Sequence, residues 1–314
     1  MTLVNKKKVG NIAFSVFRTL FFIGMIYVLL FPLFVMLSRS LRTVEDMYNP
    51  AIIWIPQHFT LANFKEAAKL LNYSSAALKT GRLALLCTLL SMASCSMAGY
   101  ALGHYKLKCN TLFTVIAVLT IIVPLQAYII PLFFRFRFFD FLGIGSVLEL
   151  FGANGKVNLV NGELPYYILA VTGMGIRSGL FIWIFMQFFR SMPRELDDAA
   201  RIDGCGEAAT FIRIMLPNAL SPYLVTFILS IVWYWNDTAY SGVFSQKNPL
   251  LATSMNNLKA LLLAEKGATT RGDGTGETVI IFAAALIYIL PPLIMYLFAQ
   301  KAFMQGVERT GIVG

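Results

Sequence analysis

Histidine and cysteine, which often supply acid–base, nucleophilic or metal chemistry, are few in this sequence. The two histidines, His58 and His104, fall in different loops that are expected to lie on opposite sides of a membrane, so they cannot share one site. The four cysteines have no short metal-binding spacing, and they are Cys87, Cys95, Cys109 and Cys205. We therefore expect no metal site and no disulfide, and a polytopic membrane enzyme is disfavoured because it would need such a cluster near one interface.

Residues that could capture energy are also missing from the chain. The nearest approach to a phosphate-binding loop, residues 152–156, lacks both the glycine-to-lysine spacing and the following Ser or Thr. Arg177 is the one charge inside an apolar run, and we expect it to end a short helix at the interface before a span that starts near Ser178; a functional charge in the pore is the alternative. A proton- or ion-coupled secondary carrier needs intramembrane acids or histidines, so it is disfavoured as well. Energy for any transport must come from another protein.

The one group of residues with a distinctive spacing lies between Arg190 and Pro217. Ser191 is expected to be a helix N-cap, with Pro193 in the first turn. Gly204 and Gly206 permit a reversal, so two short helices joined by a glycine turn are predicted. The acidic residues near the positive end of the first helix are Glu195, Asp197 and Asp198.

The spacing within this loop resembles the signature of the inner-membrane permease subunits of ABC importers. That signature is Glu-Ala-Ala, three residues, Gly, nine residues, Ile, one residue, Leu-Pro. The residues that match it are Asp198, Ala199, Ala200, Gly204, Ile214, Leu216 and Pro217. Asp198 departs from the family's glutamate, which keeps the charge and shortens the side chain by one methylene. Glu-Ala-Ala also occurs at 66–68 and 207–209, without the glycine and Leu-Pro that complete the pattern.

The resemblance implies that residues 190–217 form a coupling loop that docks on a cytoplasmic ATPase. MgATP would be bound and hydrolysed by partner subunits, and this chain would carry no cofactor and no catalytic residue. Asp198 would pair with a basic group or cap a helix of the ATPase. Three arginines of the loop would either contribute to the rim of the contact or anchor the loop at the membrane surface, and they are Arg194, Arg201 and Arg213.

The composition places the rest of the chain in a membrane. Of its 314 residues 57 % are hydrophobic and 13 % charged, and the mean hydropathy is +0.68. These values exclude a soluble enzyme and argue against a nucleic-acid binder. Uncharged runs long enough to cross a bilayer predict an all-α protein with six transmembrane helices. The predicted spans are 20–37, 83–102, 111–134, 166–189, 218–235 and 279–300.

The distribution of Lys and Arg sets the expected orientation. The net charge is +10, and cations are denser in the short segments 1–19, 103–110, 190–217 and 301–314 than in the intervening loops. The positive-inside rule then puts both termini in the cytoplasm, with residues 20–300 forming the multi-pass domain. The family resemblance implies that the membrane is the cytoplasmic membrane of a prokaryotic cell. The run 20–37 is longer than a signal-peptide core and lacks a cleavage site, so it is expected to stay as the first span.

Further stretches resemble the carbohydrate branch of the family, and within it the second, smaller permease of maltose-type importers. The matching stretches are 99–102, Pro124, Gln126, Ile130 and Pro131, 235–237, and the glycines of the C-terminal tail. The implied partners are a homologous permease, two ATPase subunits, an extracytoplasmic sugar-binding protein, membrane lipid and the sugar itself.

Aromatic residues make up 14 % of the chain, and sugars bind by stacking on rings while amides and hydroxyls contact their hydroxyl groups. Small polar residues within spans also join helices to one another, so packing is the competing interpretation for each candidate. The candidate substrate-pathway residues are Gln126, Tyr128, Trp183, Thr226, Ser230, Trp233, Tyr234 and Asn236. The prediction is a sugar permease, and an ABC permease for another small solute is the main alternative.

Overall fold

The computed structural model describes residues 2–105, 108, 110–140, 143, 155–266 and 275–311. Within these ranges the regular structure is helical, apart from two isolated β-bridges. The chain divides into two compact units. The first comprises Met1–Asn72 and Asn257–Ile289, and the second comprises Tyr73–Asn256 and Leu290–Gly314.

The first unit contains two long apolar helices and three short ones. Its elements are α1 (Thr2–Ser40), α2 (Val44–Tyr48), α3 (Ala62–Leu70), α16 (Leu258–Lys266) and the first part of α17 (Thr275–Gly311). The segment that follows α1 is held by buried polar contacts. The side-chain amide of Asn63 donates to the carbonyls of Ser40 and Arg42, at 2.9 and 2.8 Å. Arg42 in turn donates to the carbonyl of Ile52 at 2.9 Å.

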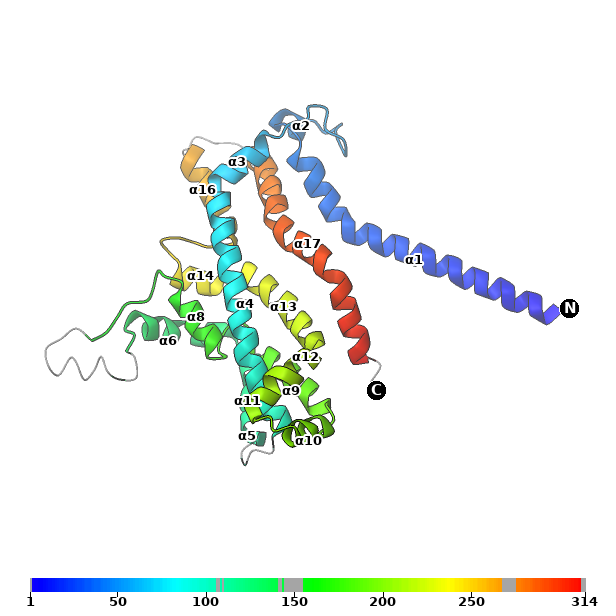
Figure 1. Cartoon of the computed structure of the whole chain (residues 1–314). Helices are drawn as coiled ribbons and strands as arrows, with labels where there is room; N and C mark the ends of the chain where they lie inside the picture. Colours follow the sequence, from blue (N-terminus) through cyan, green and yellow to red (C-terminus); the bar gives the residue numbers. More distant parts are fainter. Residues whose placement is uncertain are drawn as a thin grey trace. The chain divides into compact units, whose positions relative to one another are not determined.

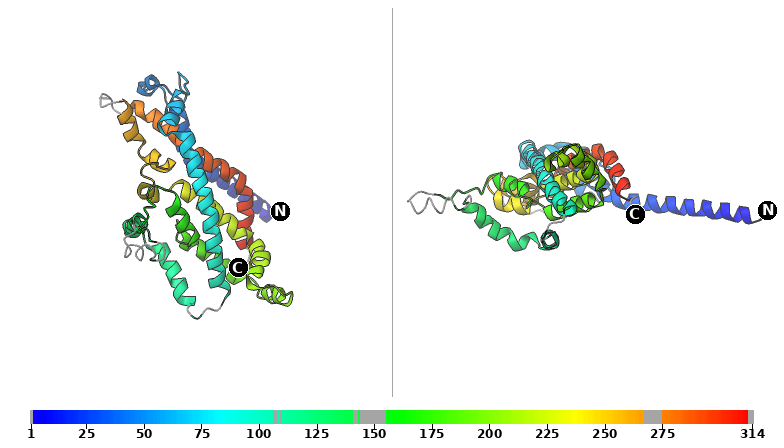
Figure 2. Two further views of the ribbon diagram at one scale, coloured as in Figure 1. Left: turned by 60° about the vertical axis from the view of Figure 1, so that its left-hand side comes forward. Right: turned by 60° about the horizontal axis from the view of Figure 1, so that its bottom comes forward.

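The second unit is built around one long helix, α4 (Tyr73–His104). It packs against α8 (Leu164–Val171), α9 (Ser178–Ser191) and α13 (Leu220–Trp235) (Figures 1 and 2). Glycine lets α4 and α9 approach closely, as in small-residue contacts between membrane helices. A Cβ added at Gly99 would lie 2.5 Å from the Cβ of Phe185, and one at Gly103 would lie 2.5 Å from the carbonyl oxygen of Met186.

Three described helices are long and apolar enough to cross a membrane alone: 11–40 of α1, 73–104 of α4, and 277–301 of α17. Two bent pairs raise this number to five among the described residues. In one pair α5 (Asn110–Ile122) meets α6 (Leu125–Arg137) at an angle of 101°. The predicted span 111–134 is therefore a broken helix, because Pro124 has no backbone N–H to continue it.

The predicted span 166–189 is also interrupted. Helix α8 ends at Val171 and α9 begins at Ser178, the position expected for the start of a span. Arg177 occupies the break with a left-handed backbone (φ 58°), and its guanidinium lies 5.8 Å from the centre of the Trp233 ring. Its side chain therefore contacts an aromatic ring at the helix break and does not lie within a continuous helix.

The last two predicted spans also differ in their limits. The segment Glu207–Asn218 meets α13 at 77°, so the helix begins at Leu220 and not at residue 218. Helix α17 continues through 301–311, and residues 312–314 lie outside the described ranges. After α13, the carboxylate of Asp237 accepts from the backbone of Tyr240 and Ser241 and thereby caps α14 (Ala239–Phe244); α15 (Leu251–Asn256) follows.

Candidate functional site

Residues 190–217 fold as two short helices around a glycine turn, as their sequence predicts. Helix α10 (Glu195–Ile202) leads to Gly204, whose φ of +77° is the left-handed conformation that favours glycine. Helix α11 (Glu207–Thr210) follows. The acidic residues predicted near the start of the first helix do lie in its first turn.

The expected N-cap at Ser191 is wrong. Ser191 is the last residue of α9, and its hydroxyl donates to the carbonyl of Phe188 at 2.7 Å. Pro193 disfavours a helical conformation at the residue before it, and Met192 is extended (φ −72°, ψ 140°). The chain therefore leaves α9 before the proline, and α10 begins after it. Arg194 occupies the N-cap position of α10, and its side chain makes no capping hydrogen bond.

The end of the loop is a bend that redirects the chain into α13. A π-helical turn, η1 (Phe211–Met215), is followed by α12 (Leu216–Asn218), which contains Pro217. A π-helical turn and a proline are both recognised causes of helix bending. Met215 and Ala219 are fully buried on the inside of the bend, whereas Leu216 and Pro217 are exposed.

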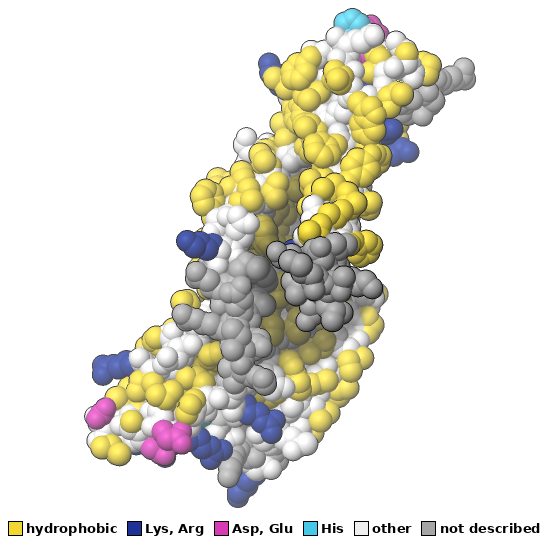
Figure 3. All heavy atoms as spheres, turned by 90° about the vertical axis from the view of Figure 1, so that its right-hand side faces the viewer, with side chains coloured by type: hydrophobic (Ala, Val, Ile, Leu, Met, Phe, Trp, Pro, Cys, Tyr) yellow, Lys and Arg dark blue, Asp and Glu magenta, His cyan; other side chains and the backbone are white. Residues whose placement is uncertain are grey.

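Helix α10 has one buried face and one exposed face. Asp197 and Ala200, three residues apart, are buried. Asp198 and Ala199 are exposed, and Ile202 is 87 % exposed. On the side of the second unit seen in Figure 3, charged side chains gather at the end that carries α10 and α11.

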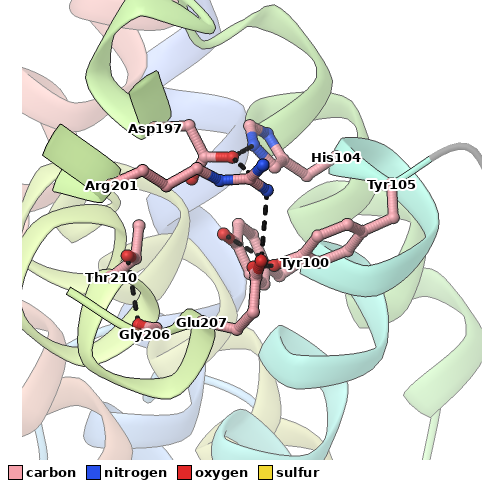
Figure 4. Close-up of polar contacts among 8 residues, drawn as sticks. All are labelled: Tyr100, His104, Tyr105, Asp197, Arg201, Gly206, Glu207 and Thr210. Carbon is pink, nitrogen blue, oxygen red and sulfur yellow. Dashed lines mark hydrogen bonds and ion pairs between the residues drawn. The ribbon is translucent and has the colours of Figure 1, made fainter. Parts of the chain in front are cut away.

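The buried face of α10 is joined to the end of α4 by a hydrogen bond between the side chains of His104 and Asp197. Nε2 of His104 lies 2.9 Å from Oδ2 of Asp197, and the two side chains are 5 % and 10 % exposed (Figure 4). The His104 ring stacks on Tyr100 with its centroid 5.0 Å away. The second carboxylate oxygen of Asp197 has no hydrogen-bond partner in the described part of the chain.

Helix α11 is joined to the same end of α4 by Tyr105, the residue that follows His104. The hydroxyl of Tyr105 donates to the carboxylate of Glu207, and the hydroxyl of Tyr100 lies 3.3 Å from that of Tyr105 (Figure 4). Burial and the hydrogen bond to Glu207 both raise the pKa of Tyr105, so it stays a protonated donor. We call His104, Tyr105, Asp197, Arg201 and Glu207 the polar cluster.

Arg201 links the two halves of the polar cluster. Its guanidinium lies 3.1 Å from a carboxylate oxygen of Glu207 and 3.7 Å from one of Asp197. Sequence reasoning did not assign a role to His104, to Ile202 or to the side chain of Asp197 beyond its charge. Residues three apart lie on the same face of a helix, so the spacing of Asp197 and Ala200 indicates that these two residues share one face of α10.

Four of the candidate substrate residues lie on α13, and the hydroxyl groups of three of them make hydrogen bonds within the protein. Ser230 accepts a hydrogen bond from Thr88 of α4 at 2.9 Å. The Tyr234 hydroxyl lies 3.3 Å from the Ser91 hydroxyl and accepts from the backbone N–H of Ile176 at 3.4 Å. Thr226 donates to the carbonyl of Pro222, one turn earlier in its own helix, at 2.8 Å.

The other five candidates are spread over three elements. Gln126 and Tyr128 are exposed on α6, and Trp183 is half-buried on α9. Trp233, on α13, contacts both Arg177 and the ring of Phe181. Asn236 is exposed, and its amide donates to the carbonyl of Val232. The eight candidates therefore come from different helices, and whether they share a sugar pathway stays a prediction.

The described residues contain no group of three His, Cys, Asp or Glu side chains that could hold a metal ion. Cys87 and Cys95 are buried thiols and Cys205 is half-buried, whereas Cys109 lies outside the described residues.

Comparison with known proteins places these features in a wider context. The family described as "Binding-protein-dependent transport system inner membrane component" matches residues 95–309, which include α10, α11 and most of the second unit. A crystal structure of a bacterial ABC transporter involved in the import of the acidic polysaccharide alginate has the same fold, with a TM-score of 0.66 at 15 % identity. The match covers 94 % of this chain and 98 % of that one.

Curated relatives match over nearly the whole chain. The probable starch degradation products transport system permease protein AmyC of Thermoanaerobacterium thermosulfurigenes is 26 % identical, over 91 % of this chain and 93 % of its own. The arabinooligosaccharides transport system permease protein AraQ of Bacillus subtilis is 27 % identical, over 96 % of this chain and 98 % of its own.

Proposed function

The chain belongs to the family of binding-protein-dependent transport system inner membrane components, and from this we propose that it is the permease subunit of an ATP-driven sugar importer. Its cargo is an oligosaccharide. The observation that carries the proposal is that relatives named for starch degradation products and for arabinooligosaccharides align with more than nine-tenths of the chain. It assembles with a second, homologous permease, two ATPase subunits and an extracytoplasmic sugar-binding protein.

In this proposal the 190–217 loop is the contact with the ATPase. Asp198, Ala199 and Ile202 are three of the exposed residues of α10 that a partner can reach. A one-carbon side chain at Ala199 permits close approach, Ile202 supplies apolar area, and the Asp198 carboxylate pairs with a basic group. Ala200 is buried and Ile214 is half-buried, so these two hold the loop in shape from inside, and Pro217 lies in the bend that ends the loop. MgATP is bound and hydrolysed by the partner subunits.

The scarcity of charged residues of either sign in the apolar runs favours a neutral cargo. A bound anion would need basic residues along the pathway, and Arg177 is the one charge in those runs. Tyr128 and Trp233 offer aromatic faces and Gln126 offers an amide, so these three remain proposed sugar contacts. The hydrogen bonds of Ser230 and Tyr234 favour a packing role for both residues.

The test is to purify the chain with its co-expressed partners and to measure both the amount of ATPase retained and its rate of ATP hydrolysis. We expect Asp198→Lys to reduce ATPase retention at least tenfold, because it places a cation where an anion docks. Gly204→Pro has the same expected effect, since proline cannot adopt a φ of +77°. Glu45→Lys is the matched control, because Glu45 is an exposed carboxylate on α2.

The cargo class is tested in the same complex with its binding protein. Maltotriose or arabinotriose should raise the rate of ATP hydrolysis, and a phosphorylated polyol should not. Full ATPase retention by both loop variants would disprove the docking role. Stimulation by the anion alone would assign the permease to another solute.

A further inference from the structure

Two adjacent residues at the end of α4 contact two different helices of the 190–217 loop. His104 binds Asp197 on α10, and Tyr105 binds Glu207, the first residue of α11 (Figure 4). These contacts join parts of the chain that are about a hundred residues apart in sequence. The end of α4 therefore holds both sides of the glycine turn at once.

One face of α10 is held by several contacts, and the opposite face is exposed. Arg201 bridges Asp197 and Glu207 across the turn, so the two short helices are also tied to each other. Beneath them the ring of Phe211 lies 5.0 Å from that of Tyr100. The opposite face of α10, with Asp198 and Ile202, makes none of these contacts and is exposed.

Helix α4 continues without interruption from the polar cluster to the far end of the second unit. Its 32 residues span about 48 Å at 1.5 Å per residue. Near Tyr73 the hydroxyl of Thr80 accepts from the backbone of Leu251, and Arg82 pairs with Glu163 at 2.6 Å. One uninterrupted helix thus connects the loop with the segments beyond α13 and before α8.

We propose that His104 and Tyr105 are positioning residues that lock the 190–217 loop to α4, so that a displacement of α10 moves α4 with it. This rests on the proposed function, because the displacement is the one that the ATPase would impose on the exposed face of α10. Contacts on that face decide whether the ATPase binds. Contacts of the polar cluster decide whether its movement reaches the rest of the unit.

Substitutions on the exposed face of α10 and substitutions in the polar cluster are expected to have different effects. Without the exposed contacts the ATPase dissociates. Without the polar cluster it remains bound and hydrolyses ATP, and α10 moves without α4. The measurement that separates these cases is the amount of sugar taken up per ATP hydrolysed, because a merely structural residue lowers both quantities together.

The experiment uses the complete importer in proteoliposomes, with radiolabelled maltotriose or arabinotriose as the probe, whichever stimulates hydrolysis in the wild type. We expect His104→Ala to keep ATPase retention within twofold of wild type and to lower sugar uptake per ATP at least tenfold. Tyr105→Phe removes the hydroxyl and keeps the ring, and a threefold reduction of the same ratio is expected. It also serves as the deciding variant if His104→Ala does not assemble.

Rescue and a matched control complete the design. His104→Arg should recover uptake per ATP to within threefold of wild type, because a guanidinium can bind the Asp197 carboxylate. His58→Ala breaks a His–Asp contact of similar length, 2.8 Å to Asp46, in the other unit, and it should leave the ratio unchanged.

A wild-type ratio in both His104→Ala and Tyr105→Phe would overturn the proposal. So would a loss of ATPase retention in Tyr105→Phe equal to that in Asp198→Lys, because the polar cluster would then serve docking alone. Failure of the proposed function is distinguishable, since Asp198→Lys would then retain the ATPase and the wild-type complex would not couple hydrolysis to sugar.

Discussion

Asp197 and Asp198 are neighbours with opposite environments. A helix turns by about 100° per residue, so one carboxylate faces the end of α4 and the other faces outward. Asp197 is 7 % exposed and paired with His104, and a charge at such a position requires its partner. Asp198 is exposed on the opposite side of the helix. Two acids with the same chemistry thus differ in burial, and the proposed ATPase contact uses the exposed one.

Ile202 gives the first prediction at this scale. Replacing it by lysine should weaken ATPase binding to the importer about tenfold, or ~1.4 kcal/mol, because an exposed isoleucine on a docking helix loses its apolar burial. Binding is measured by titrating the purified ATPase onto the permease pair. Ile55→Lys is the matched control, since Ile55 is 82 % exposed in the first unit. Equal affinity of wild type and Ile202→Lys would remove Ile202 from the docking surface.

The pair Asp46 and His58 predicts a pH dependence. Burial raises the pKa of Asp46, but hydrogen bonds from the backbone and ring of His58 more than offset this, so it lies below 3.8. The hydrogen bond to Asp46 raises the pKa of His58 above 6.5. Asp46 therefore stabilises the fold above pH 3.8 and loses this effect at lower pH. His58 stabilises it below pH 6.5 and loses this effect as pH rises through its raised pKa.

The corresponding measurement is the hydrogen-exchange protection of residues 43–60 as a function of pH. Protection should be greatest between pH 3.8 and 6.5 and should fall on the alkaline side as His58 loses its proton. In His58→Gln the alkaline decrease should disappear. Protection that rises with pH through this range would show that the pair is not formed.

Which side chains contact one another in the folded chain was the least predictable feature from the sequence. The signature fixed the spacing of Asp198 to Pro217, but His104 lies 93 residues before Asp197 and neither residue carries a motif for the other. Ser230 and Tyr234 illustrate the same limit. Their residue types suit a sugar or a helix contact equally well, and only the positions of Thr88 and Ser91 distinguish the two.

At the scale of the element, the glycine turn offers a matched pair of substitutions. Gly204 has a φ of +77°, whereas Gly206 has an ordinary φ of −74°, and a Cβ at either position meets nothing within 4 Å. Gly204→Ala should therefore cost about 1–2 kcal/mol in the conformation of the turn, and Gly206→Ala should cost far less. The readout is ATPase retention, with reduced binding expected for Gly204→Ala alone. Equal effects of the two changes would contradict the left-handed turn.

The contact between α4 and α9 gives a second element-scale prediction. At Gly103 a methyl group would lie 2.5 Å from a backbone oxygen, which cannot move aside like a flexible side chain. Gly103→Ala should destabilise the chain by about 1–3 kcal/mol. At Gly81 of the same helix the nearest atom is 3.8 Å away, so Gly81→Ala should be neutral or stabilising. Thermal unfolding in detergent compares them, and an unchanged midpoint in Gly103→Ala would contradict the close packing.

Helix positions were largely predictable, and helix ends were not. Apolar runs located the long helices because length and hydropathy are local properties of the sequence. The 101° bend at Pro124 and the exit from α9 before Pro193 depend on how each proline is accommodated by its neighbours. Proline can kink a helix or end it. In α17 Pro291 and Pro292 do not end the helix at all.

At the scale of the whole molecule, the sequence supports a division of labour between subunits. The chain belongs to a family of inner-membrane transport components, and the function proposed above assigns it the membrane passage and assigns the energy supply and cargo delivery to partner proteins. The central claim that follows is that α10 is the point where the ATPase binds.

The most direct test is a photo-crosslink in the intact complex. A photoreactive phenylalanine derivative is placed at Ala199 on the exposed face of α10, and for comparison at Val157, which is 56 % exposed in the same unit. Irradiation should join the ATPase subunit to the chain labelled at position 199 and not to the chain labelled at 157. A crosslink of equal yield at both positions, or none at 199 in a complex that still hydrolyses ATP, would contradict the assignment of α10 as the ATPase-binding helix.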